Sequence, residues 1–308
     1  MSLDRIRLAS LHDKVISAEE ASAFIEDGMT VGMSGFTRAG EAKAVPLALV
    51  KRAHTNPLKI TLITGASLGN DLDKQLTEAG VLARRLPFQV DNTLRKAINN
   101  GEVMFIDQHL SETVEQMRNL QLKKPDVAII EAVAITEDGG IIPTTSVGNS
   151  ASFAIFAEKV IVEINTNLSP AFEGLHDIYI PTYRPTRQPI PLTQVDERIG
   201  THAINIDPAK IVGIVINNDL HDSPSTVTAP DDETQGIADH LIAFFEKEVA
   251  EERLPKNLGP LQAGIGSIAN AVLTGLKDSN FEDLVMYSEV LQDCTFELID
   301  AGKMKFAS

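Results

Sequence analysis

The stretch Asp126-Val127-Ala128-Ile129-Ile130-Glu131 is the part of this chain that decides its fold class. Four consecutive apolar residues stand between two acids, so a strand built from them has no polar face. Strands of this kind are buried on both sides, and they occur in parallel sheets that helices cover on both faces. We therefore expect this stretch to be an inner strand of a largely parallel sheet.

Similar apolar runs occur on both sides of this stretch and alternate with amphipathic segments. The strand candidates are Thr30–Ser34, Ile60–Thr64, Val103–Ile106, Lys159–Ile164 and Ile211–Ile216. The helix candidates are Ala18–Glu26, Val45–Ala53, Asp91–Ile98 and Ser111–Leu120. Strands that alternate with helices of this length predict βαβ units and hence an α/β fold with a parallel sheet. The exception is 135–142, where Asp138-Gly139 favours the positive-φ turn of a β-hairpin.

Two segments interrupt this alternation. Residues 168–197 contain five prolines and predict an irregular connection at the surface. His221–Asp232 is polar and rich in Ser, Thr and Pro, which is typical of a linker. We place a domain boundary near residue 226, which gives domains 1–225 and 226–308. The second domain opens with an amphipathic helix over Asp232–Glu251. Its expected buried stripe consists of Ile237, Leu241, Ile242, Phe244 and Phe245.

Composition excludes several classes of function. The 308 residues include 27 Lys and Arg against 43 Asp and Glu, for a formal net charge of −16, which disfavours a nucleic-acid partner. No apolar run is long enough to cross a membrane, and the seven histidines lack metal-binding spacing. The one cysteine, Cys294, suits a reducing compartment. We expect a cytoplasmic protein without a metal.

The clearest functional motif is Gly264-Ile265-Gly266-Ser267-Ile268, followed by good helix formers over Ala269–Leu276. Glycines allow a tight turn, and the unpaired backbone N–H groups of a helix N-terminus bind phosphates and oxyanions. A dinucleotide-binding fold would place an acid about 20 residues further on, and Glu289 lies 25 residues after Gly264. Only 19 residues follow Glu289, however, so we disfavour that alternative.

Glu289 follows the strand-like run Leu284-Val285-Met286-Tyr287, and Asp293–Ala301 is predicted to be a helix. Open α/β sheets place functional groups at the carboxyl ends of their strands. An acid in such a position is often only an exposed polar residue. Its combination with the glycine loop favours a functional role.

The order of motifs along the whole chain resembles the bacterial acetate-utilising CoA-transferases. This family includes succinyl-CoA:acetate and propionyl-CoA:succinate CoA-transferases and the related acetyl-CoA hydrolases. The resemblance rests on 34–37 (SGFT), 63–67 (ITGAS), 134–141 (AITEDGGI), 145–150 (TSVGNS), 264–266 (GIG) and 287–293 (YSEVLQD).

The resemblance implies a specific site. Glu289 matches the family's catalytic glutamate, which becomes a glutamyl-CoA thioester, so CoA is substrate and covalent cofactor. Gly264, Ile265, Gly266, Ser267 and Ile268 match the loop that contacts CoA, although Ser267 stands where we expect asparagine. Family members continue beyond residue 308, which leaves the C-terminal lobe incomplete here.

Three functions therefore remain open. The first is transfer of CoA between short-chain acids such as acetate, succinate and propionate by a ping-pong mechanism. The second is acetyl-CoA hydrolysis on the same glutamate. The third is a non-catalytic CoA-binding fragment. The expected partners are acyl-CoA and carboxylate substrates, and the family also implies a homodimer.

Overall fold

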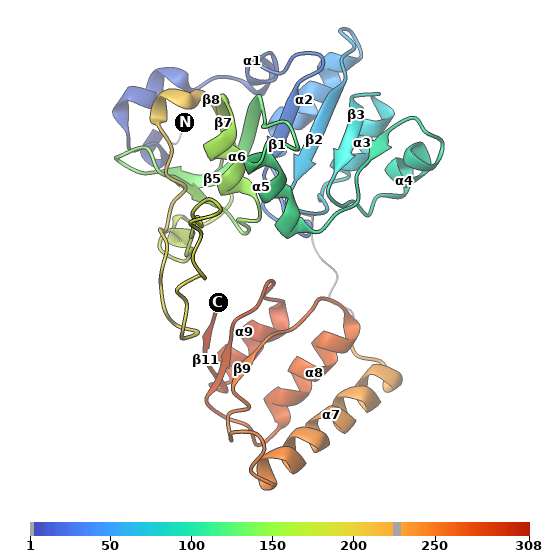
Figure 1. The fold of residues 1–308 in the computed structure, drawn as a ribbon, viewed down its shortest axis with the longest axis vertical. Coiled ribbons are helices and arrows are strands. Elements are labelled where there is room, and N and C mark those ends of the chain that lie inside the picture. Colours follow the sequence, from blue (N-terminus) through green and yellow to red (C-terminus); the bar gives the residue numbers. More distant parts are fainter. Residues whose placement is uncertain (1–2, 224–228) are drawn as a thin grey trace. The chain divides into compact units, whose positions relative to one another are not determined.

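The structure, a computed structural model, describes residues 3–223 and 229–308. Its contacts divide the chain into two compact units (Figure 1). The first unit contains residues 3–188 and 200–223, and the second contains 189–199 and 229–308. The predicted boundary near residue 226 lies outside the described residues.

The first unit is built on one large sheet with strand order β4-β3-β2-β1-β5-β7-β8, in which all these neighbours are parallel. The strands are β1 Thr30–Met33, β2 Ile60–Thr64, β3 Leu82–Leu86, β4 Met104–Phe105, β5 Val127–Ile135, β6 Ile141–Pro143, β7 Lys159–Asn165 and β8 Ile211–Asn217. Short β6 pairs antiparallel with β5. This confirms the α/β fold class and the parallel sheet.

The helices of this unit cover both faces of the sheet. They are α1 Ala18–Ser22, α2 Ala44–Ala53, α3 Leu72–Glu78, α4 Asn92–Asn99, α5 Leu110–Arg118 and α6 Ser150–Phe156. Short 3-10 turns lie at Leu3–Arg5, Ala9–Lys14, Pro170–Phe172 and Pro208–Lys210. The predicted helix at Ala18 ends four residues earlier than expected, whereas that at Val45 begins one residue earlier.

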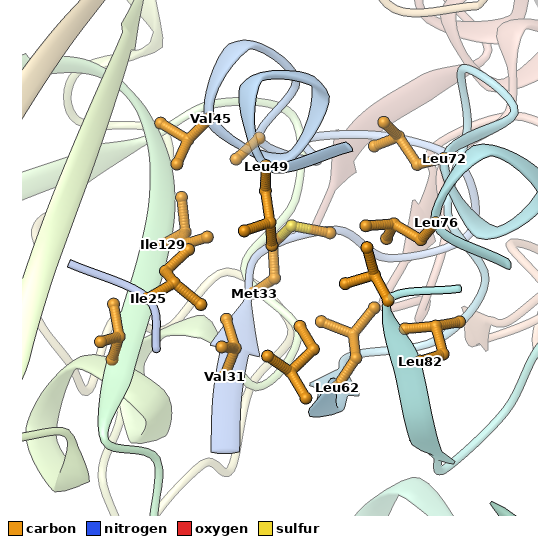
Figure 2. Packing of buried hydrophobic residues seen from close by; sticks show 14 of the residues in the cluster. Ile25, Val31, Met33, Val45, Leu49, Leu62, Leu72, Leu76, Leu82 and Ile129 are labelled. Atoms are coloured by element: carbon orange, nitrogen blue, oxygen red, sulfur yellow. The ribbon is translucent and has the colours of Figure 1, made fainter. Parts of the chain in front are cut away.

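The central strand β5 is buried at every position, as the fold-deciding stretch predicts. Its residue Ile129 belongs to the cluster on one face, which also includes Val45 and Leu49 of α2 and Leu72 and Leu76 of α3 (Figure 2). The neighbouring Ala128 and Ile130 belong to the cluster on the opposite face, together with Phe153 of α6. Because successive side chains of a strand point to opposite faces, this division explains the uninterrupted apolar run.

Gly32, in the middle of β1, is required by the close approach of α6. A Cβ atom added at Gly32 would lie 2.8 Å from Cγ of Phe153. No ordinary side chain fits at such a distance. The glycine therefore allows the aromatic ring to pack directly against the sheet.

The expected hairpin after β5 is present. β5 and β6 pair antiparallel, with Ile135 opposite Ile141, and the Thr136 amide donates to the Gly140 carbonyl. Gly139 has a φ of 89°, as the Asp-Gly pattern predicts.

The second unit combines a three-stranded parallel sheet with three helices. The strands are β9 Pro260–Leu261, β10 Leu284–Met286 and β11 Met304–Ala307, and the helices are α7 Asp232–Ala250, α8 Ser267–Asp278 and α9 Asp293–Asp300. β10 lies between β9 and β11. The hydrophobic core of this second unit includes Leu273, Leu284, Met286 and Leu298.

The buried stripe of α7 differs from the expected one. Ile237 and Phe244 are exposed, so their assignment to the core is wrong. Ile242 and Phe245 pack against the core as expected, and Ala238 and Val249 complete the packed face at spacings of four or three residues. Gly275 of α8 lets the two helices approach, because a Cβ there would lie 2.5 Å from Cδ1 of Ile242. The apolar face of α7 is thus rotated toward α8.

Candidate active site

Glu289 lies on the loop that leaves the carboxyl end of β10, three residues after Met286. The side chain is exposed. Among residues 3–223 and 229–308, its carboxylate has no recorded hydrogen bond or ion pair. A carboxylate in this state is available to react with a ligand at the edge of the sheet.

The glycine loop lies before α8. Gly266 is the N-cap of this helix, with φ 121° and ψ 175°, a conformation that side-chain-bearing residues rarely adopt. Among the residues that the structure describes, no side chain forms a capping hydrogen bond with this helix. The first-turn amides of Ser267, Ile268 and Ala269 lie before the first intrahelical hydrogen bond, which Asn270 donates to the Gly266 carbonyl. These amides can donate to an anion.

Two side chains join the glutamate loop to the glycine loop. The Ser288 hydroxyl donates to the Ala263 carbonyl over 3.1 Å and accepts from the Ala263 amide over 3.4 Å. The Gln292 amide group donates to the Gly264 carbonyl over 2.8 Å, and its oxygen accepts from the Gly266 amide over 3.3 Å. Glu289 lies between these two residues in sequence. The structure thus brings the two predicted motifs together, and the sequence analysis missed the roles of Ser288 and Gln292.

Replacing Gln292 with alanine is expected to loosen this junction. Two hydrogen bonds of about 0.5–1.5 kcal/mol each would be lost. We therefore expect the affinity for CoA, the ligand that the family resemblance implies, to fall roughly tenfold while the fold remains intact. Isothermal titration with CoA measures the affinity, and circular dichroism checks the fold. Gln262→Ala is the matched control, because within residues 3–223 and 229–308 that side chain bonds only to the adjacent Ala263 carbonyl. Equal affinities of the two variants would contradict the proposed role.

The first unit contains a buried polar network that the sequence analysis did not anticipate. Glu131 of β5 and Glu163 of β7 lie opposite each other in register. The Lys43 ammonium lies 2.5 Å from Glu131 Oε1 and 2.6 Å from Asp222 Oδ1. Glu163 accepts from the backbone amides of Lys43, which is the N-cap residue of α2, and of the first two residues of this helix. All but Asp222 are almost completely buried.

Burial controls the protonation of this network. It raises the pKa of Glu131 to about 7, although Lys43 and Thr144 oppose the shift. It also raises the pKa of Glu163, against three backbone amides that favour the charged form. Burial alone would lower the pKa of Lys43, but Glu131 and Asp222 raise it above its usual value. Lys43 therefore stays charged while Glu131 titrates near neutrality.

Asp222 connects this network to the segment predicted as a linker. The hydroxyl of the neighbouring Ser223 donates to Oδ1 of the Asn70 side chain over 3.0 Å and accepts from the backbone N–H of Asn70 over 2.9 Å. The start of His221–Asp232 is therefore bound to the first unit, and α7 begins at its other end. Residues 224–228 of the predicted linker lie outside the described residues.

In the part of the chain that the structure describes, no group of three or more His, Cys, Asp or Glu side chains is arranged to hold a metal ion. No helix of residues 3–223 and 229–308 has the length and apolar character needed to span a membrane. Cys294 is buried beside Asn270, and its pKa is raised by burial.

Solved structures share the fold of this chain. RipA from Yersinia pestis superimposes with a TM-score of 0.69 at 19% identity, over 96% of this chain and 60% of that one. A 4-hydroxybutyrate CoA-transferase from Porphyromonas gingivalis gives a TM-score of 0.60 at 18% identity, over 96% and 59%. At such low identity these likenesses show the fold alone.

Sequence comparison assigns the family. Residues 2–216 match the model of the acetyl-CoA hydrolase/transferase N-terminal domain, and the chain belongs to this family. It is 45% identical, over 306 residues, to a succinyl-CoA:acetate CoA-transferase of Clostridium kluyveri, and 43% identical, over 316 residues, to an acetyl-CoA hydrolase of Kluyveromyces lactis. Each alignment covers 99% of this chain but 57% and 60% of those relatives. The chain thus spans about three fifths of their length.

Proposed function

We propose that this chain carries the nucleophile of an acyl-CoA:carboxylate CoA-transferase that moves CoA between short-chain acids such as acetate, succinate and propionate. The observation that carries the proposal is the exposed carboxylate of Glu289, on a loop whose flanking residues bind the glycine loop. The Clostridium kluyveri relative, a succinyl-CoA:acetate CoA-transferase, supports this class of substrates.

The proposed reaction exchanges one acyl bond for another of similar energy. The Glu289 carboxylate attacks the thioester carbonyl, which forms an acyl-glutamyl anhydride and releases CoA thiolate. The thiolate then attacks the glutamyl carbonyl, which expels the first carboxylate and leaves a glutamyl-CoA thioester. The second carboxylate reverses both steps. This is covalent catalysis with ping-pong kinetics.

Each addition step places negative charge on a carbonyl oxygen. Backbone amides at the entrance of α8, from Gly264 to Ile268, are our candidates for stabilising that charge, and one such donor is typically worth about 2.7–4 kcal/mol. Uncapped amides also suit the phosphates of CoA. They allow an acidic chain to bind an anionic ligand without many cationic side chains.

Acetyl-CoA hydrolysis is the second candidate. It is supported by the identity of 43% with the Kluyveromyces lactis acetyl-CoA hydrolase. The same glutamyl thioester would form, but water rather than a second carboxylate would attack it. The two functions therefore differ in how well the site excludes water. A chain that binds CoA without catalysis is the third candidate.

The test is to incubate the 308-residue chain with succinyl-CoA or acetyl-CoA and to measure its intact mass. We expect a CoA-sized adduct that maps to the peptide containing Glu289 and is lost on borohydride reduction. Discharge of the adduct by acetate rather than by water distinguishes the transferase from the hydrolase. CoA binding without an adduct would reject both enzymes and favour the binding function. The same samples, analysed by sedimentation, test the expected homodimer.

A further inference from the structure

Three arginines of the first unit converge on one carboxylate. Arg118, at the end of α5, places Nη1 3.0 Å from Oε1 of Glu115. The other two arginines lie in the segment 168–197, which contains five prolines. Nε of Arg184 lies 3.5 Å from Oε2 of Glu115, and Nη1 of Arg187 lies 3.1 Å from Oε1. We call these four residues the arginine cluster.

The charges of the arginine cluster do not balance. Three guanidinium groups surround a single carboxylate, and within the described ranges none of them has another recorded ion pair. The cluster therefore holds two positive charges in excess, in a chain whose formal net charge is −16. Like charges held this close repel each other. A bound anion would remove that repulsion.

One arginine of the cluster is fixed and mostly buried. The side chain of Arg118 is 3% exposed, and its Nη2 donates to the Pro181 carbonyl over 2.9 Å. Its guanidinium carbon lies 5.0 Å from the ring centre of Tyr183. Its Nε is buried and has no hydrogen-bond partner in the described part of the chain. Arg118 and Glu115 thus form a rigid base for the other two arginines.

The other two arginines face solvent with most of their donors unused. The side chain of Arg184 is 71% exposed and that of Arg187 is 34% exposed. A guanidinium group has five N–H donors in a planar fork. For residues 3–223 and 229–308, Glu115 is the only recorded partner of either side chain. Such forks match the oxygen atoms of a phosphate group.

We propose that the arginine cluster is a binding site for a phosphate monoester dianion, which Arg184 and Arg187 contact directly. A phosphate dianion matches the two excess positive charges and the paired donor geometry. Two sources share this chemistry. One is the 3′-phosphate of a CoA molecule that the first unit itself binds, which rests on the proposed function, and the other is a separate phosphorylated metabolite.

The proposal is tested by equilibrium binding to the intact chain at low ionic strength. The probes are inorganic phosphate and adenosine 3′,5′-bisphosphate, and the variant is Arg184→Gln/Arg187→Gln. We expect at least a tenfold loss of affinity for adenosine 3′,5′-bisphosphate and a shallower dependence on salt. Arg95→Gln/Lys96→Gln is the matched control, because it removes two positive charges from the exposed surface of α4 and should change affinity less than twofold.

Comparing CoA with dephospho-CoA distinguishes the two sources. If CoA is the source, CoA binds more tightly than dephospho-CoA, and the double variant loses this preference. If another metabolite is the source, phosphate probes bind but that preference does not change in the variant. Failure of both probes to bind, or equal losses in the variant and the control, overturns the proposal. Neither outcome depends on the reactivity of Glu289, so the proposed catalytic function is tested separately.

Discussion

Replacing Glu289 with alanine is expected to abolish the CoA adduct and to lower CoA transfer by at least on the order of a thousandfold. Removing a nucleophile eliminates the covalent route, and comparable losses in other enzymes reach about 10⁶-fold. The residual rate would come from binding alone. Intact mass and the rate of acetyl-CoA formation from succinyl-CoA and acetate measure the two effects.

Glu289→Asp gives a graded version of the same test. Aspartate keeps the carboxylate but withdraws it by one methylene, and a displacement of about 1 Å can cost on the order of 10²-fold in rate. Glu282→Gln is the matched control, since this exposed acid lies just before the other end of β10. We expect near-normal transfer by the control. Turnover by Glu289→Ala at the unmodified rate would exclude the mechanism.

Replacing Lys43 with methionine is expected to destabilise the first unit by about 3–5 kcal/mol at pH 8, the range found when one partner of a buried ion pair is removed. Methionine has a similar size, so the loss of charge dominates. Glu131 and Asp222 would lose the ammonium that contacts both of them. Urea denaturation followed by circular dichroism measures the change in the free energy of unfolding.

This destabilisation should shrink in acid. The pKa of Glu131 is raised to about 7 in the folded protein, so ionisation of this residue opposes folding as pH rises from its unfolded pKa toward neutrality. Without Lys43 this cost grows, because the ammonium no longer offsets the burial of the charge, which leaves the hydrogen bonds from Thr144 and Asn165. At pH 5.5 Glu131 is protonated, and Lys43→Met should be less damaging than at pH 8.

Lys51→Met is the control for this prediction. Lys51 lies in α2, the helix that Lys43 immediately precedes, but its ion pair with Glu19 is exposed and 3.5 Å long. Exposed pairs of this kind contribute about 0–1 kcal/mol, so the control should unfold almost as the unmodified chain does. A similar small effect of Lys43→Met at pH 8 would show that the buried network does not stabilise the unit.

Local patterns predicted much of the fold. The run at Val127–Ile130 identified a strand buried on both faces, and Asp138-Gly139 identified the hairpin. The prediction ended this strand at Glu131, whereas β5 continues to Ile135. A charged residue normally ends an apolar run. Here Lys43, 88 residues away in sequence, neutralises the glutamate, and such a distant contact leaves no local signal.

Strand β3 was missed for the same physical reason. Its sequence, Leu82-Ala83-Arg84-Arg85-Leu86, contains two charges in five residues. Arg85 is nevertheless buried, because its Nε lies 2.8 Å from Oδ1 of Asp73 in α3. For α7 the sequence predicted the wrong face of the helix. Apolar residues recur every three or four positions along more than one face of α7, and only the packing against α8 shows that the face with Ala238 is buried.

The candidate site was predicted in part. The glycine loop and Glu289 stand in short motifs that are recognisable in the sequence, and their roles remain proposals. Ser288 and Gln292 carried no signal of their own, because polar residues in a loop usually face water. Their importance depends on the position of 263–266, which only the folded chain defines.

Within the loop that contains Glu289, the residues that fix the backbone differ from the residue that is proposed to react. Ser288 and Gln292 hold the backbone in place, while the side chain of Glu289 between them has no recorded hydrogen bond or ion pair in the described part of the chain. Acylation would erase the negative charge of Glu289, yet the hydrogen bonds of its neighbours do not involve that charge. The hydrogen bonds that hold this loop therefore do not depend on the chemical state of Glu289. The same loop conformation can carry the free acid, the anhydride and the thioester in turn.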